Sequence, residues 1–274
     1  MPLLRKTLHD LRWQIAGYGV GLGLLAALYV VLYPTFAATL PDLELPEAYS
    51  AFIGDVSDLS SPRNFLQIEF FSLWLPLLVA IYAIVASTAQ LAGDEGNGTL
   101  ELLLAQPVSR RRLFLERATG LLIGALVICA LASLGFLVSA PFIDLRGDVT
   151  VLELMVAPLG TVAFAFAFIA LGLLAGTIAA TRGQAVGLLT AATVAFYLMD
   201  VLPDLTDALA PLRYLSPFYY GDTKRMLITG VVPWHQAVLF VSAALCTALA
   251  MRAFEAREIG VGRWQPRALL GRSA

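Results

Sequence analysis

Lysine is almost absent from this sequence of 274 residues, in which Lys6 and Lys224 are the only two. A nucleotide-binding P-loop has the pattern GxxxxGK[ST], because its lysine contacts the phosphates of the nucleotide. Lys6 follows an arginine and Lys224 follows a threonine, so neither lysine fits this pattern. The sequence therefore excludes a P-loop ATPase within this chain, and any ATP hydrolysis must come from another chain.

Histidine and cysteine are equally scarce, with two residues of each. His9 and His235 form no HExxH motif, which argues against a zinc protease, and no GxSxG turn offers a serine nucleophile. Cys129 and Cys246 lie in apolar runs without a CxxC pattern, so we expect both to pack as small apolar residues. The sequence thus predicts no catalytic centre, no metal site and no cofactor site in this chain.

Charged residues are also few, at 14% of the chain, whereas soluble domains have about 25%. Hydrophobic residues make up 59%, and the mean hydropathy is +0.79. The net charge of −2 gives no reason to expect a nucleic-acid partner. This composition is typical of a protein whose main surroundings are membrane lipid.

Long apolar runs supply the membrane spans. A bilayer core about 30 Å thick is crossed by about 20 apolar residues in a helix. We therefore predict an all-α integral membrane protein, a single transmembrane domain over residues 1–274, whose six spans lie near 13–36, 66–92, 113–140, 152–180, 185–202 and 233–254. Leucines at helical spacing in residues 1–12 predict an amphipathic lead-in helix. The first apolar run exceeds the roughly 7–15 residues of a signal-peptide core, which favours a retained span.

Positive charges indicate the orientation of these spans, because cytoplasmic loops are enriched in Lys and Arg. With the N-terminus inside, the inner segments hold most of the 18 such residues, namely Arg5, Lys6, Arg12, Arg110, Arg111, Arg112, Arg117, Arg182, Arg252, Arg257, Arg263, Arg267 and Arg272. We therefore predict that both termini, including a tail over residues 255–274, are cytoplasmic.

The middles of the predicted spans are almost free of charge. Glu69, Glu153 and Asp200 lie near the outer ends of their helices, where they can reach water. A charge at the bilayer centre would cost about 3 kcal/mol or more, and ion-coupled carriers commonly keep ionisable groups there. The three carboxylates are candidates for lining the outer part of a substrate path. They are also the polar groups that a membrane-embedded enzyme would have to bring together.

The inner segment 93–112 differs from a plain connection between spans. Glycines and Asn97 break the preceding helix, and Thr99 can cap a new short helix whose first turn holds Glu101. Pro107 ends this helix near Gln106, and Ser109 can cap the next helix, which runs into the third span. Its leucines Leu100, Leu103 and Leu104 share one face. A helix of one or two turns is not stable alone, so it must pack on the membrane surface, on its own bundle or on a soluble partner.

The same segment resembles the signature of ABC-2 type transporter permeases. The residues that carry the resemblance are Asp94, Glu95, Gly98, Thr99, Leu100, Glu101, Leu102, Leu103, Leu104, Pro107, Val108, Ser109 and Arg110. Arg117 matches the basic residue that often follows, and residues 215–218 and 252–259 are also similar to the family. Gln106 departs from it, because a small residue or threonine is more usual before the proline.

The resemblance implies the permease subunit of an ATP-driven exporter in a prokaryotic inner or plasma membrane. Residues 99–106 would be a coupling helix seated in a separate ABC ATPase subunit, which is expected in two copies and would hold the ATP and Mg²⁺. A second copy of this permease, or a related one, would complete the unit, with a path built from the second and fifth spans. A membrane-embedded enzyme and an ATP-independent carrier stay open as alternatives.

Overall fold

The computed structural model describes residues 2–39, 61–93, 109–142 and 148–256. This described part is built of helices and short connections, without a strand. The segments that are long and apolar enough to cross a membrane are Leu3–Ala38, Pro62–Gly93, Arg110–Phe142, Val151–Ile178, Arg182–Asp204 and Pro233–Ala256. The prediction of an all-α membrane protein with six spans is therefore confirmed, with most boundaries within a few residues.

The first span is one continuous helix, α1 (Pro2–Thr39). The predicted lead-in segment is the beginning of this helix rather than a separate element, because no glycine or proline interrupts the chain between residues 3 and 16. One stripe of α1 is buried, through Leu11, Leu22, Ala26 and Val30. This stripe packs on the third span, α7 (Arg110–Ser139), which continues into η4 (Ala140–Phe142).

Small residues let α1 and α7 approach until their backbones touch. A Cβ added at Gly135 of α7 would lie 2.1 Å from the carbonyl oxygen of Gly23 in α1. Close approach of this kind is a common way for helices to gain packing contacts in lipid, where no hydrophobic effect drives them together.

The second span begins as α3 (Pro62–Leu66), with Ser61 as its N-cap and Pro62 in the first turn. It continues as a π-helical stretch, η2 (Gln67–Trp74), then as α4 (Leu75–Thr88), and it ends in a second π-helical stretch, η3 (Ala89–Gly93). π-helical segments are rare, and many of those that are known lie at functional sites. The two ends of this span are thus the places where its regular helix gives way.

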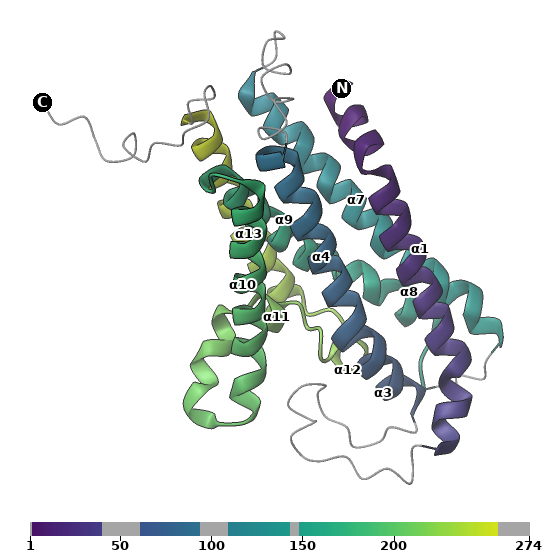
Figure 1. Cartoon of the computed structure of the whole chain (residues 1–274). Coiled ribbons are helices and arrows are strands. Elements are labelled where there is room, and N and C mark those ends of the chain that lie inside the picture. The colour runs from purple at the N-terminus through teal and green to yellow at the C-terminus, as the bar shows by residue number, and fades with distance from the viewer. Residues whose placement is uncertain (1, 40–60, 94–108, 143–147, 257–274) are drawn as a thin grey trace, which may run out of the picture.

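The fourth span is divided into α8 (Val151–Gly160) and α9 (Val162–Ile178), with Pro158 just before the break. α9 is buried along most of its length and packs on α4, on α7 and on the last span, α13 (Pro233–Ala256). Figure 1 shows α9 in the middle of the bundle, with α1 towards one edge and α10 and α13 towards the other.

The fifth span is α10 (Arg182–Val201), and much of its surface is exposed. Between α10 and α13 the chain forms short helices: η5 (Leu202–Asp204), η6 (Asp207–Leu215), α11 (Pro217–Tyr220) and α12 (Met226–Thr229). The starts of α1 and α7 and the end of α13 lie at one end of the bundle, here called the amino-terminal end. α3 and α12 lie at the opposite end, here called the distal end (Figure 1).

Candidate functional site

The predicted coupling helix, with Asp94, Glu95 and the other signature residues up to Val108, lies outside the described residues. Its two flanks are described. The second span ends at Gly93 in η3, and Ser109 caps α7 by accepting a hydrogen bond from the backbone N–H of Arg112 at 3.3 Å. The prediction that Ser109 caps the helix of the third span is therefore confirmed.

A buried arginine joins these two flanks directly. Arg117, on the second turn of α7, is only 3% exposed, and its guanidinium donates a hydrogen bond to the backbone carbonyl of Gln90 in η3. A buried charge is costly unless it is paired or hydrogen-bonded, so this contact holds the end of the second span against the start of the third. The two described helix ends between which residues 94–108 lie are therefore held together.

Two further contacts tie neighbouring helices to the start of α7. The Glu116 carboxylate accepts hydrogen bonds from the backbone N–H of Leu4 and from Nε of Arg112, both at 2.8 Å. The first N–H groups of a helix lack partners within it and favour negative charge, so Glu116 suits the beginning of α1. Arg110 donates to the backbone carbonyl of Glu255 at the end of α13, at 3.3 Å. We call Gln90, Arg110, Glu116 and Arg117 the loop base.

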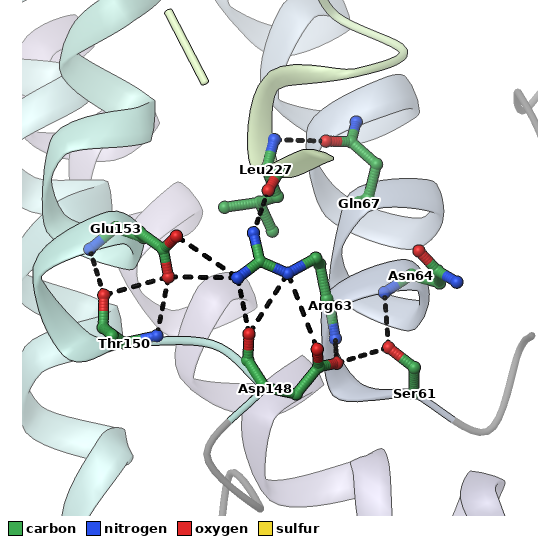
Figure 2. A network of polar contacts seen from close by, with 8 residues as sticks. All are labelled: Ser61, Arg63, Asn64, Gln67, Asp148, Thr150, Glu153 and Leu227. Atoms are coloured by element: carbon green, nitrogen blue, oxygen red, sulfur yellow. Dashed lines mark hydrogen bonds and ion pairs between the residues drawn. The ribbon is translucent and has the colours of Figure 1, made fainter. Parts of the chain in front are cut away.

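The distal end holds a second polar network, which Figure 2 shows around Arg63. The Arg63 guanidinium donates to the backbone carbonyl of Asp148 at 3.1 Å and to both carboxylate oxygens of Glu153 at 3.2 Å. It also donates to the carbonyl of Leu227. Arg63 therefore joins α3 to the segment before α8 and to α12.

Gln67 extends this network into the bundle, where it is only 1% exposed. Its side-chain nitrogen donates to the carbonyl of Thr223 at 2.8 Å, and its side-chain oxygen accepts from the N–H of Leu227 at 2.7 Å. Ser72 Oγ also donates to the Thr223 carbonyl, at 3.2 Å. Gln67 and Ser72, which lie five positions apart in η2, thus both bind the segment 223–227.

The three predicted path carboxylates have different surroundings. Glu153 completes a capping box with Thr150 and pairs with Arg63. It therefore caps the start of its own helix, α8, and binds the helix that carries Arg63, α3. Asp200 pairs with Lys224, Nζ to Oδ2 at 3.2 Å, and Lys224 also reaches Asp204 at 2.8 Å. Among the residues that the structure describes, no Lys, Arg or His forms an ion pair with Glu69. The carboxylates are therefore not one cluster.

Sequence reasoning did not single out Asp222, which the structure pairs with a histidine. His235 Nδ1 lies 2.7 Å from Asp222 Oδ1, and the rings of Tyr219 and Tyr220 pack on the imidazole with centroids 5.1 and 5.5 Å away. Burial raises the pKa of the Asp222 carboxyl above its ordinary value, and the hydrogen bond from His235 opposes this shift. No local signal marked the pair, because thirteen residues separate the two side chains.

Comparison with known protein families gives a match that spans most of the chain. The family model described as multidrug efflux system permease Rv1217c, C-terminal domain, matches residues 7–255. No curated protein matches the sequence. The matched range contains the second to fifth membrane-spanning segments entirely and nearly all of the first and sixth, and it includes the loop base and the network around Arg63.

Proposed function

Because the chain belongs to the family of the multidrug efflux system permease Rv1217c C-terminal domain, and is thus a transporter permease, we propose that it is the membrane-spanning subunit of an ATP-driven ABC exporter. The observation that carries this proposal is the signature in residues 94–110, in a chain that has no P-loop lysine. The energy source must then be a separate ATPase, which would hold ATP and Mg²⁺. Drug-like compounds are the proposed cargo, by analogy with the family description.

The coupling contact is proposed to consist of Asp94, Glu95, Gly98, Thr99, Leu100, Glu101, Leu102, Leu103, Leu104, Pro107 and Arg110. The loop base supports this role. A force applied to residues 94–108 would act on η3 and α7 together, because Arg117 joins them. It would also act on α1 through Glu116 and on α13 through Arg110. A small movement of one docked helix would then displace several spans at once.

A second copy of the permease is proposed to pack against α10. Small residues repeat every four positions along an exposed face of this helix, at Gly183, Gly187, Ala191 and Ala195. A Cβ added at Gly187 would meet nothing within 4 Å. Small residues at this spacing allow two membrane helices to approach closely. Both termini are proposed to be cytoplasmic in a prokaryotic inner or plasma membrane, on the evidence of the positive charges.

Affinity purification from the source membrane tests the proposal. The tagged full-length chain is expected to bring down an ABC ATPase, identified by mass spectrometry, and the complex should hydrolyse ATP. Glu95→Arg or Leu103→Arg should abolish the association or uncouple hydrolysis from transport. Asp10→Arg is the matched control, because Asp10 is an exposed acid at the same end of the bundle and, among the described residues, pairs only with Lys6 one turn away. A wild-type chain that purifies alone and transports without ATP would refute the proposal.

A further inference from the structure

One acidic side chain within the membrane-spanning part forms no ion pair with a cation among the described residues. Glu69 lies in η2 of the second span and is half-buried. Glu153 and Asp200 each pair with a cationic side chain from another segment, whereas Glu69 pairs with no cation of the described chain. A charge inside a membrane span is costly. An acidic residue at such a place therefore indicates a functional site, and the group that pairs with its charge has to be identified.

Glu69 lies on a face of the second span that the other described residues leave uncovered. Leu73 and Leu77, one and two turns further along the helix, are 45% and 42% exposed. The opposite face of the same helix is buried, through residues such as Phe70 and Phe71. The carboxylate is therefore accessible from the side of the bundle, next to apolar surface.

Two aromatic side chains complete the surroundings of Glu69. Trp74 Nε1 donates a hydrogen bond to the Tyr29 hydroxyl oxygen at 2.8 Å, and the Tyr29 hydroxyl in turn interacts with the Glu69 carboxylate. The ring of Tyr29 packs edge-on against Phe65, with centroids 6.1 Å apart. Tyr29 and Trp74 are both half-buried, so each ring is held in place and still partly open. Trp74 and Glu69 thus both interact with the Tyr29 hydroxyl, which brings the three side chains together.

We propose that Glu69, Tyr29 and Trp74 form a binding site for an organic cation, an ammonium or phosphonium group carrying apolar substituents. The carboxylate supplies the opposite charge, the aromatic rings attract the cation through their faces, and Leu73 and Leu77 cover its apolar substituents. A bare metal ion fits poorly, because Ca²⁺ and Mg²⁺ take six or more oxygen ligands and a single carboxylate is present here. That this cation is transported as cargo rests on the proposed function. That it binds at Glu69 does not depend on the proposed function.

Binding of tritiated tetraphenylphosphonium to the purified full-length chain tests the site in the absence of any ATPase. The chain is placed in lipid discs of phosphatidylglycerol, which has no cationic headgroup, and bound label is measured by scintillation proximity. Wild-type protein should bind the cation saturably, and an excess of unlabelled tetraphenylphosphonium should displace the label. Glu69→Gln should weaken binding roughly tenfold to a hundredfold, because it removes the charge and keeps the side-chain shape. Tyr29→Phe should weaken it less, because it keeps the ring.

Controls separate the site from general effects on the fold. Asp10→Asn removes an exposed carboxylate from the far end of the helix that carries Tyr29, and it should bind the cation as wild type does. Discs that also contain phosphatidylethanolamine distinguish the two sources of such a cation. Weaker binding of the label to wild type, but not to Glu69→Gln, would identify a lipid headgroup as an occupant of the same site. If phosphatidylethanolamine left the binding of the label to wild type unchanged, the occupant would be a soluble or transported cation instead of a lipid headgroup.

Equal binding of tetraphenylphosphonium by wild type and Glu69→Gln would overturn the inference. The inference would also be overturned if wild type did not bind the cation saturably and Glu69→Gln changed the measured mass from that of a dimer to that of a monomer. The carboxylate would then pair with a second copy of the chain. Failure of an ATPase to co-purify would refute the proposed exporter function and leave the binding result unchanged. The two proposals therefore fail in different measurements.

Discussion

The contact between α1 and α7 gives a prediction whose size follows from the structure. In Gly135→Ala, the new Cβ would lie 2.1 Å from the carbonyl oxygen of Gly23, and 2.7 and 2.8 Å from its carbonyl carbon and Cα. Cβ contacts essentially never fall below 3.0 Å, so the two helices would have to separate by about 1 Å. The clashing atoms belong to backbone, so no side chain can rotate to relieve the overlap.

Overpacking of this kind typically costs about 1–3 kcal/mol of stability. Gly21→Ala is the matched control, because its Cβ would meet nothing within 4 Å on the same helix pair. Both variants gain the same helix propensity from alanine, so their difference isolates the clash. Gly23→Ala should fall between them, because its Cβ would lie 2.7 Å from the carbonyl of Leu131.

Thermal unfolding of the purified variants in detergent checks the prediction. A loss of 1 kcal/mol lowers Tm by roughly 2–4 °C in proteins of about 150–250 residues. The melting temperatures should therefore rank Gly135→Ala below Gly23→Ala below Gly21→Ala, with several degrees between the first and the last. A Gly135→Ala variant that melts together with Gly21→Ala would refute the close packing of α1 on α7.

Three further predictions concern the polar networks. Arg63→Gln should destabilise the protein by about 1–3 kcal/mol in the same assay, because it leaves Glu153 without its cation, and Arg63→Lys should recover only part of the loss because lysine lacks the planar fork. Arg117→Gln should leave the spans folded, by circular dichroism, and lower transport-coupled ATP hydrolysis; normal coupling would contradict the role of the loop base. Because burial raises the folded-state pKa of Asp222, its protonated form stabilises the protein below the ordinary aspartate value of about 3.9, and this contribution is lost as pH rises through the raised pKa. The melting temperature of wild type relative to Asp222→Asn should therefore fall as pH rises over that window, with His235 unchanged in both, and an increase would contradict the raised pKa.

The number and type of the spans could be predicted because length and hydropathy decide which helices cross a bilayer. The cap at Ser109 could be predicted because it depends on neighbouring residues alone. The continuous α1 was missed because the amphipathic pattern of residues 1–12 indicates a surface helix, and packing on α7 decides whether that helix continues into the membrane. The fourth span was predicted as one helix, although Pro158 marked the place before its break.

The functional side chains were harder to predict, because their partners come from distant segments. Glu69, Glu153 and Asp200 look alike in sequence, each an acid near the end of a span. Arg63 reaches Glu153 across 90 positions and Lys224 reaches Asp200 across 24, so only the packing of the bundle shows which acids are neutralised. The sequence shows three acids near the ends of spans, and the tertiary contacts separate Glu69 from the two acids that pair with a cation.

The positions of the two networks constrain how such a permease could change access. Arg117, Glu116 and Arg110 join four helical segments at the amino-terminal end, and Arg63 and Gln67 join others at the distal end. Opening a path through the middle of one subunit would break hydrogen bonds at both ends, and each of the buried ones, made by Arg117 and Gln67, costs about 1–3 kcal/mol when a partner is left unsatisfied. Movement of the bundle as a unit against a second copy would break none of them. We therefore expect the change of access to occur between the two proposed copies, along surfaces that the described residues leave uncovered, such as α10 and the Glu69 face of the second span.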